Sequence, residues 1–286
     1  MRKFLLMALL LTLPTGAQAG RPQPAAGEAS QVARYHGVLI RVPDLVRARA
    51  FYVGTLGFSE QRVSETMVRL IDDSPIYLEQ SPGPLRPPEV DEARSAIAFQ
   101  ALDIHATARR LRELGVVFLS DEPIRVGVGL ALRFRDPFGN IHALLQQTIG
   151  EVAPFEEPEV YNSGFKQPDS DTPALRRMFA GLGFVVRSER YYPPSLPIGH
   201  GDGSFAFMLH ENEPEEPEVR ARSQPESAAV SLIFTAADLA AVRQQVGSGR
   251  EDAFALGRRM RVTAPSGVPV EFWRLTPDAR TRSPTG

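Results

Sequence analysis

The sequence predicts an α+β protein made of four β-α-β-β-β modules, grouped in pairs into two tandem domains. Two observations support this fold class. A strand-like run, a helix and further strand-like runs occur in the same order four times. Landmarks also recur between the two halves: GTLGF at 54–58 matches AGLGF at 180–184, and RFRDPFGNIHALL at 133–145 matches RVTAPSGVPVEFW at 261–273. A repeat of such long period decides the fold more strongly than the propensity of any single segment.

The first half contains two of these modules. Residues 37–42 (GVLIRV) are a short apolar run typical of a strand, and Asp44 can cap a helix over 45–57 whose apolar residues recur at helical spacing. In the second module Asp103 is the cap of a helix that Gly115 ends. Strand-like runs complete the two modules at 66–72, 75–81, 95–102, 116–120, 130–136 and 141–146.

The second half repeats this order after an acidic linker. Its predicted helices cover 171–184, where Pro173 suits the first turn, and 238–247. We interpret the charged segment 213–226 as a solvated loop. The strand-like runs lie at 160–167, 184–191, 204–211, 229–236, 258–264 and 268–275.

The composition excludes several classes of protein. The 286 residues are 43% hydrophobic and 23% charged, with a formal net charge of −2, which is typical of a globular protein and argues against a nucleic-acid binder. Without cysteine there is no disulfide, no thiolate metal site and no cysteine nucleophile. The sequence also lacks a Walker-type loop and a G-x-S-x-G elbow.

The first residues have the three parts of a secretory signal peptide: Arg2 and Lys3, an apolar run at 4–13, and AQA at 17–19. The run is too short for a membrane-spanning helix, which needs about 20 residues. We therefore predict an exported protein, periplasmic or extracellular, without a membrane segment after cleavage. The predicted organisation is signal peptide 1–19, disordered leader 20–33, domain 34–149, linker 150–159, domain 160–276 and disordered tail 277–286.

Two segments resemble the vicinal oxygen chelate superfamily, which includes glyoxalases, bleomycin-resistance proteins and extradiol dioxygenases. They are RVPDLVRARAFYVGTLGF at 41–58 and FRDPFGNIHALLQ at 134–146. The second half matches more loosely, through 171–184 and 265–275, so that the resemblance extends over 34–276. It implies paired modules whose curled sheets enclose clefts for a metal or an organic ligand.

The resemblance also implies where metal ligands would stand. One is a His or Gln seven residues before the first helix cap, another a His or acid on the first strand of the second module, and the last a Glu four residues after the turn glycine of the final strand. In the first half these positions are Gly37, Ala96 or Ile97, and Ala143, which cannot ligate a metal.

The turn before Ala143 is nevertheless kept. We expect Gly139 and Asn140 to accept unusual backbone angles there and to fix the register of the final strand. His36 and His142 each stand one residue before a ligand position. Because strand side chains alternate, they would point away from the cleft unless a β-bulge intervenes.

In the second half the corresponding positions are Asn162, Ser231 or Leu232, and Glu271, so that one acid remains. Three interpretations of Glu271 stay open: a metal ligand, a general base for catalysis, or the partner of a cleft arginine such as Arg261. The spacing of His200 and His210 to this acid gives no support for a metal site.

Other residues are candidates for ligand binding. Arg41 shares the strand face of the first ligand position, and Lys166 is its counterpart in the repeat; either contacts an anionic ligand or is a solvated strand end. Asn162 is a further candidate. Tyr191 and Tyr192 precede a Pro/Gly-rich stretch, 193–203, which either covers the cleft or packs as an ordinary loop.

Three functions remain open. We favour a binding module, monomeric or homodimeric, that captures a small organic ligand outside the cytoplasm without a metal or other cofactor. The first alternative is a metal-dependent lyase or dioxygenase with its site in the second domain. The second is an interaction protein that docks through its sheets or through the acidic segment 211–218. The sequence identifies neither the ligand nor whether the modules pair within one chain.

Overall fold

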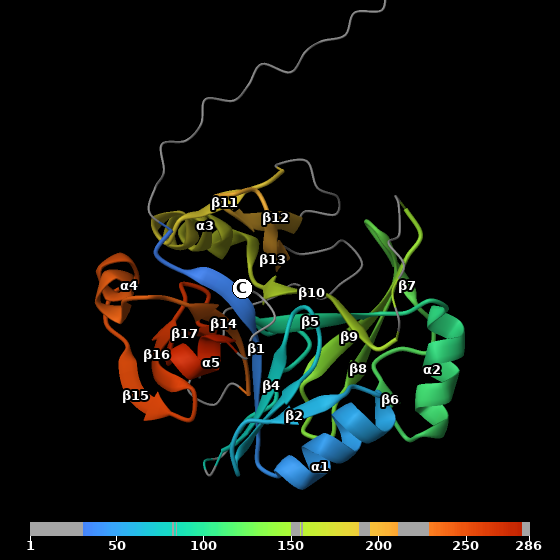
Figure 1. Cartoon of the computed structure of the whole chain (residues 1–286). Helices are drawn as coiled ribbons and strands as arrows, with labels where there is room; N and C mark the ends of the chain where they lie inside the picture. Colours follow the sequence, from blue (N-terminus) through green and yellow to red (C-terminus); the bar gives the residue numbers. More distant parts are fainter. Residues whose placement is uncertain are drawn as a thin grey trace, which may run out of the picture.

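All four predicted modules are present. The computed structural model describes residues 31–81, 83, 85–149, 155, 157–188, 195–210 and 229–281, and its elements follow the predicted order along the chain (Figure 1). The predicted signal peptide lies outside the described residues. Among the helices that are described, none has the length and apolar character needed to cross a membrane.

The two modules of the first half contain most of the expected strands. Module 1 consists of β1 (Arg34–Val42), α1 (Leu45–Arg49) continued by the π-helical η1 (Ala50–Thr55), β2 (Glu60–Arg62), β3 (Met67–Leu70) and β4 (Ile76–Gln80). Module 2 consists of β5 (Arg94–Gln100), α2 (Ile104–Glu113), β6 (Val117–Phe118), β7 (Ile124–Val126), β8 (Gly129–Arg135) and β9 (Ile141–Gln147).

The two modules of the second half are built in the same way. Module 3 consists of β10 (Glu159–Lys166), the 3-10 turn η2 (Asp169–Asp171), α3 (Thr172–Gly181), β11 (Phe184–Val186), β12 (Ser195–His200) and β13 (Phe205–His210). Module 4 consists of β14 (Val230–Thr235), α4 (Leu239–Val246), β15 (Arg250–Phe254), β16 (Gly257–Thr263) and β17 (Pro269–Leu275), and α5 (Pro277–Thr281) follows.

Aspartate side chains fix where three of the helices begin. Asp44, Asp103 and Asp238 accept hydrogen bonds from backbone N–H groups in the first turns of α1, α2 and α4. A capping carboxylate of this kind satisfies donors that have no partner within the helix. The caps predicted at Asp44 and Asp103 are therefore confirmed, as is the place of Pro173 in the first turn of α3.

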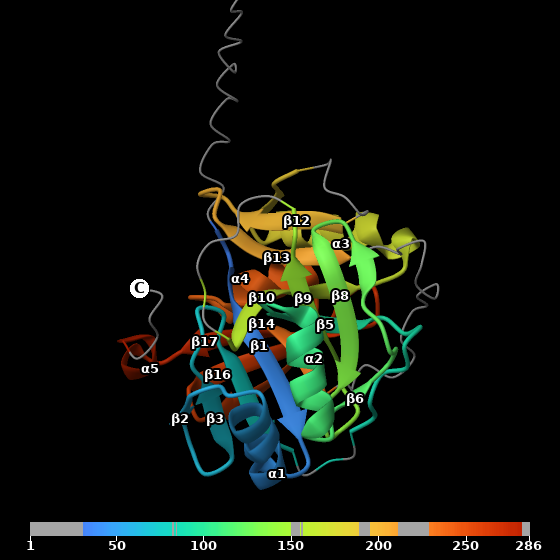
Figure 2. The same ribbon diagram turned by 90° about the vertical axis from the view of Figure 1, so that its right-hand side faces the viewer.

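The strands form two curled sheets. The first sheet has the strand order β15-β16-β17-β14-β1-β4-β3-β2, and the second has β11-β12-β13-β10-β5-β9-β8-β6, with β7 added beside β8. Antiparallel pairing of β1 with β14 joins module 1 to module 4, whereas antiparallel pairing of β5 with β10 joins module 2 to module 3. Figure 2 shows β8, β9, β10 and β13 of the second sheet together on one side of the molecule.

This pairing regroups the predicted metal-ligand positions. Each sheet takes one module from the range 34–149 and one from 160–276, and the modules pair within a single chain. The expected grouping of Asn162 with Glu271 is therefore wrong, because these residues lie on different sheets. A repeat identifies modules but not their partners, since the edges of β1 and β5 are both available for antiparallel pairing until side-chain packing selects between them.

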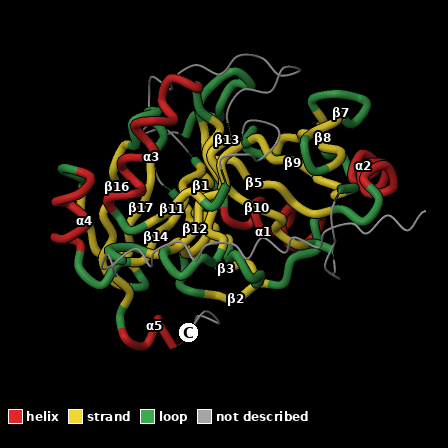
Figure 3. Tube along the Cα trace, turned by 90° about the horizontal axis from the view of Figure 1, so that it is seen from above, coloured by secondary structure: helices red, strands yellow, loops and turns green. Residues whose placement is uncertain are grey.

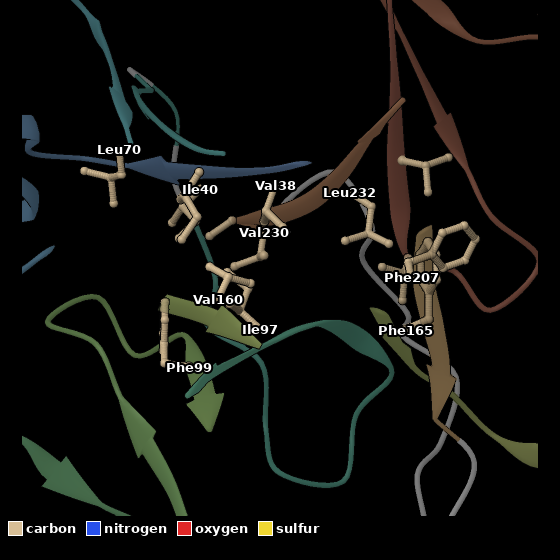
Figure 4. Close-up of a cluster of buried hydrophobic side chains, with 14 of the residues drawn as sticks. Val38, Ile40, Leu70, Ile97, Phe99, Val160, Phe165, Phe207, Val230 and Leu232 are labelled. Atoms are coloured by element: carbon tan, nitrogen blue, oxygen red, sulfur yellow. The ribbon is translucent and has the colours of Figure 1, made fainter. Parts of the chain in front are cut away.

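A single hydrophobic core lies between the sheets. Alternate residues of each central strand point into it, so that Val38 and Ile40 of the first sheet approach Ile97 and Phe99 of the second (Figure 4). All four are almost completely buried. Burial of such side chains stabilises a fold by about 1.5–3 kcal/mol each, so this layer joins the two sheets into one body. Figure 3 shows α2, α4 and α5 at the outside of this arrangement.

The ordered chain extends beyond the predicted limits. The backbone N–H groups of Val32 and Ala33 donate to the carbonyl of Leu182 at 3.1 and 3.3 Å, so residues 31–33 are ordered where a disordered leader was expected. Hydrogen bonding to the C-terminal end of α3 and burial of Ala33 are the physical cause. Glu159 begins β10 rather than ending the linker, and α5 occupies the start of the expected tail.

Candidate functional site

Each sheet has an outer face, directed away from the shared core, and the two outer faces differ in side-chain size. At the centre of the first sheet's outer face stand Gly37, Leu39, Tyr77, Ser231, Ile233 and Glu271. By repeat and register, the equivalent positions of the second sheet are Asn162, Gly164, Met208, Ala96, Ala98 and Ala143, in that order. At three of these six positions a large side chain of the first face is replaced by alanine or glycine on the second: Leu39 by Gly164, Ile233 by Ala98 and Glu271 by Ala143.

The second sheet's outer face is hollowed into a cleft. The cleft holds a cavity of about 120 Å³ and is lined from β5, β7, β8, β9, β10, β12 and β13. Ala96, Ala98 and Ala143 form its floor. Gly164 lets β10 approach β13, because a Cβ at this residue would lie 2.1 Å from the carbonyl oxygen of Met208. A cavity of roughly this size with an apolar lining accepts a ligand such as benzene.

One end of this cleft is basic. Arg94 of β5 lies directly opposite Lys166 of β10, and Lys166 lies opposite His210 of β13. Ser195 of β12 continues the row, with its hydroxyl 3.2 Å from Nδ1 of His210. All four residues line the cleft, and none of its described lining residues is acidic. We call these four residues the basic row.

The centre of the first sheet's outer face contains a buried ion-pair network. The guanidinium of Arg41 lies between two carboxylates: its Nη2 donates to Glu271, and its Nε is 3.5 Å from Glu79. Glu271 is fully buried, and it also accepts hydrogen bonds from Arg261 Nε at 3.1 Å and from Trp273 Nε1 at 2.9 Å. The ion-pair interpretation of Glu271 agrees with this geometry.

Further residues close this face. Arg259 joins the network by donating to Glu79 at 2.8 Å and to Asp252 at 2.9 Å. Beside this network, the outer face is covered by a compact cluster of buried apolar side chains: Leu39, Met67, Tyr77, Ile233, Trp273 and Leu275. Arg41 is therefore not a solvated strand end, because two acids from neighbouring strands hold it inside the protein.

A β-bulge decides the orientation of His36. The β1–β14 register shifts between Tyr35 and Gly37, so the imidazole of His36 turns onto the outer face, where its Nε2 is 2.9 Å from the hydroxyl of Tyr77. Burial, and then the charge of Arg69, lower the pKa of His36 to about 4. At neutral pH His36 is thus an uncharged, packed side chain.

His142 has a different environment and lies on the second sheet. Its ring faces the shared core, with Nε2 2.9 Å from the hydroxyl of Tyr52. The same hydroxyl donates to Asp136 at 2.8 Å. Because His36 and His142 belong to opposite sheets, a metal site that combines them is excluded.

Asp136 gives the DPFGN turn, residues 136–140, a structural role even though no metal ligand follows it. Its carboxylate accepts hydrogen bonds from the backbone N–H groups of Phe138 and Asn140 and from the side-chain amide of Asn140. Gly139 has a φ of 86°, whereas Asn140 does not need a positive φ and acts through its side chain. Burial by itself would raise the pKa of Asp136, but the nearby imidazole of His142, whose Nε2 is 3.8 Å away, and hydrogen bonds from Asn140 and Tyr52 lower it overall. The turn thus connects the helix of module 1 to the final strand of module 2.

The predicted ligand-binding residues separate into groups. Asn162 and Lys166 line the cleft of the second sheet, whereas Arg41 and Glu271 lie on the first. Tyr191 and Tyr192 fall outside the described residues. Part of the loop expected after them is strand β12, and His200 is buried, with Nδ1 2.6 Å from Gln31 Nε2. No local pattern in the sequence indicates Arg94, because its place opposite Lys166 depends on strand register.

The donor sets do not fit a divalent metal, which needs several nitrogen or oxygen ligands around one point. On the second sheet, Ala96 and Ala143 offer no donor and Asn162 offers a neutral one. On the first sheet, the single acid at a ligand position, Glu271, is surrounded by Arg41, Arg261 and Trp273. Throughout the described ranges, His, Asp and Glu nowhere form a group of three or more able to hold a metal.

Comparison with known proteins agrees with the fold described above. Residues 34–143, from β1 to β9, match the family model of the Glyoxalase/Bleomycin resistance protein/Dioxygenase superfamily. Residues 34–143 are thus similar to a domain of that superfamily. The matched range covers modules 1 and 2, which belong to different sheets, so a continuous stretch of superfamily sequence contributes to both outer faces.

Solved structures extend the likeness to the whole chain. Glyoxalase I from Zea mays is 16% identical with a TM-score of 0.55, and the match covers 85% of this chain and 92% of the maize protein. A putative dioxygenase from Bacillus subtilis is 12% identical with a TM-score of 0.54 and covers 87% of each chain. At such identities the likeness shows the fold alone. No curated protein matches the sequence.

Proposed function

We propose that this superfamily protein is an exported binding protein that captures a small organic molecule in the cleft of the second sheet without a metal ion. The observation that carries the proposal is the set of small residues at the centre of that cleft. Ala98 and Gly164 take the places that Leu39 and Ile233 fill on the other sheet. An apolar concavity with a few placed polar groups is typical of a small-molecule site.

Within this site we assign contacts to two residues predicted from the sequence. Lys166 and Asn162 both line the cleft, at the basic end and near the floor respectively. Glu271 has no role in the proposed site, because the shared core separates the two outer faces. The enzyme alternative requires a metal or a base elsewhere, and no specific observation favours it.

The binding proposal is tested with a small apolar probe. We expect 4-fluorobenzamide to show saturable line broadening in ¹⁹F NMR with the purified protein, since its single ring suits a cavity of about 120 Å³. Ala143→Phe should abolish the broadening by filling the floor. Ala180→Phe, at an exposed position of α3, is the matched control and should bind like the wild type. Broadening unaffected by Ala143→Phe would place the site elsewhere.

The metal-free part is tested separately. We expect mass spectrometry of protein purified without chelator to find far less than one metal per chain, and titration with Zn²⁺, Ni²⁺, Mn²⁺ or Fe²⁺ to leave the melting temperature unchanged. Near-stoichiometric metal that is lost in Glu271→Ala would overturn the binding proposal in favour of the enzyme alternative.

Export is tested on the full chain. We expect expression in a bacterium to yield a mature protein that begins at Gly20, as measured by mass spectrometry of the N-terminal peptide. Recovery of the intact N-terminus in the cytoplasmic fraction would contradict export.

A further inference from the structure

The two sheets have equivalent hairpins beside their outer faces. On the first sheet β15 pairs with β16, and Phe254 lies opposite Gly257. On the second sheet β7 pairs with β8 in the same register, and Val126 lies opposite Gly129. Because the registers are equal, Val126 is the counterpart of Phe254, and the two outer faces can be compared residue by residue at this end.

The final strands of the two sheets correspond in the same way. Trp273 of β17 lies opposite Arg259 of β16, and Leu145 of β9 lies opposite Ala131 of β8. Leu145 lines the cleft and lies opposite the last residue of β5, at the end away from the basic row. Leu145 therefore has the place that Trp273 has on the first sheet.

Aromatic rings of the protein surround Trp273 on the first sheet. Between ring centroids, its indole is 4.7 Å from Phe254, 4.9 Å from Tyr77 and 6.1 Å from His36. These separations are those of attractive aromatic pairs. The indole thus fills the outer face of the first sheet as a ligand would, held on three sides by side chains.

The second sheet has counterparts of these three side chains around its cleft. The register of β10 shifts around Tyr161 as that of β1 shifts around His36, so the same bulge turns both rings onto the outer face. Met208 is the counterpart of Tyr77 by register. Together with Val126, Tyr161 and Met208 line the cleft. A phenol ring, a thioether and an isopropyl group thus enclose the place that corresponds to the indole.

The second sheet leaves room at that place. Leu145 and Ala98 are smaller than their counterparts on the first sheet, Trp273 and Ile233, and both line the cavity of about 120 Å³. A cavity of roughly this size accepts a single benzene ring. A ring from outside the protein can therefore occupy the space that the protein's own indole fills on the first sheet.

We propose that the ligand of this cleft is an aromatic molecule, whose ring lies on Leu145 between Tyr161 and Met208 in the place that the indole of Trp273 has on the first sheet. This inference rests on the proposed binding function and adds the chemical class of the ligand. A phenol ring and a thioether sulfur both make favourable contacts with an aromatic ring that a saturated ring does not offer. The cleft therefore selects aromatic rings over saturated rings of similar size.

The test compares benzamide with cyclohexanecarboxamide, which has the same amide group on a saturated ring. Each displaces 4-fluorobenzamide from the full protein in ¹⁹F NMR. Burial of apolar surface alone gives benzamide no advantage, because the saturated ring has at least as much apolar surface. We expect benzamide to bind about fivefold more tightly, and Tyr161→Leu to reduce this preference to within about twofold. Tyr161→Phe keeps the ring and should keep the preference.

A second pair of variants tests the correspondence with the first sheet. Leu145→Trp places an indole where the first sheet has Trp273, so it should fill the cleft and abolish binding of 4-fluorobenzamide. Val126→Phe adds the counterpart of Phe254 and should weaken binding in the same way. Phe205→Leu removes an exposed ring of β13 outside the cleft, so it is the matched control for Tyr161→Leu and should leave the preference unchanged.

The outcomes separate the inference from the proposed function. Equal binding of benzamide and cyclohexanecarboxamide, both abolished by Ala143→Phe, would overturn the aromatic inference and leave the binding function standing. A preference that Phe205→Leu reduces as much as Tyr161→Leu would also overturn it, as would undiminished binding to folded Leu145→Trp and Val126→Phe proteins. Binding of none of the three amides would contradict both. Circular dichroism of each variant establishes that a loss of binding is not a loss of fold.

Discussion

At the scale of single residues, burial determines what each polar group does. Glu271 shows this most clearly: the sequence identifies an acid at a ligand position, but Arg41, Arg261 and Trp273 surround it in the folded protein. His36 is a second case, since a bulge places it against Tyr77 rather than at a strand end. Neither environment follows from the local sequence, because the partners come from distant strands.

The ion pair at Arg41 should be important for stability. Arg41→Met removes the positive charge that pairs with the buried carboxylates of Glu271 and Glu79. We therefore expect a loss of about 3–5 kcal/mol in the free energy of unfolding. Urea denaturation measures it. The double variant Arg41→Met/Glu271→Leu should lose less than the single one, because it buries no acid at position 271. Arg274→Met should stay within about 0.5 kcal/mol of the wild type, as expected of an exposed site. A single variant as stable as this control would contradict the buried network.

The low pKa of His36 should make the protein sensitive to mild acid. The folded-state pKa is about 4, below the ordinary value of 6.5, so the unfolded chain binds more protons between these values. The contribution to stability is therefore fully present above pH 6.5 and is lost as the pH falls through 4. We expect a loss on the order of 3 kcal/mol over this window.

The pH effect is measured as the difference between the wild type and His36→Gln in urea denaturation at several pH values. His105→Gln, at an exposed position of α2, is the control and should follow the wild type. If His36→Gln and the wild type showed the same pH dependence, the buried neutral imidazole would be refuted.

At the scale of elements, the sequence is most informative where a signal is local. The capping aspartates and the helical spacing of apolar residues predict the helices, and long apolar runs predict the central strands. The short strands β2 and β15 and the proline-containing β12 escape this reasoning. They are strands because a neighbouring strand supplies hydrogen-bond partners, which is a tertiary condition.

The close contact of β10 with β13 can be tested at Gly164. A Cβ at this position would lie 2.1 Å from the carbonyl of Met208, so Gly164→Ala must force the strands apart. We expect a loss of about 1–3 kcal/mol in the free energy of unfolding. Gly54→Ala is the matched control in η1, where nothing lies within 4 Å of the added methyl group, and it should be neutral or stabilising by about 0.5–1 kcal/mol. Thermal and urea unfolding decide between these outcomes.

At the scale of the whole molecule, the two halves of the sequence are not separate folding units. Each half contributes one module to each sheet, and the core between the sheets takes side chains from all four modules. A fragment of one half therefore exposes the edges of two central strands, which ordinarily pair with the other half. Unpaired edges of this kind promote self-association.

Expressing the halves separately tests this arrangement. We expect residues 31–149 alone to be unfolded or self-associated, and a mixture with residues 155–281 to recover a folded one-to-one complex. Size-exclusion chromatography and circular dichroism distinguish these states. A monomeric fragment 31–149 with a cooperative unfolding transition would show that module pairing across the halves is not required for folding.

The sequence by itself determined the number and order of the modules and the caps of α1 and α2, because each depends on residue type and local spacing. It also identified Lys166 and Asn162 as candidate contacts. Only the tertiary structure decided which modules share a sheet, that one outer face is filled and the other open, and that Arg94 lies opposite Lys166. These features depend on the register between strands far apart in the chain, which is selected by packing of side chains from all four modules at once.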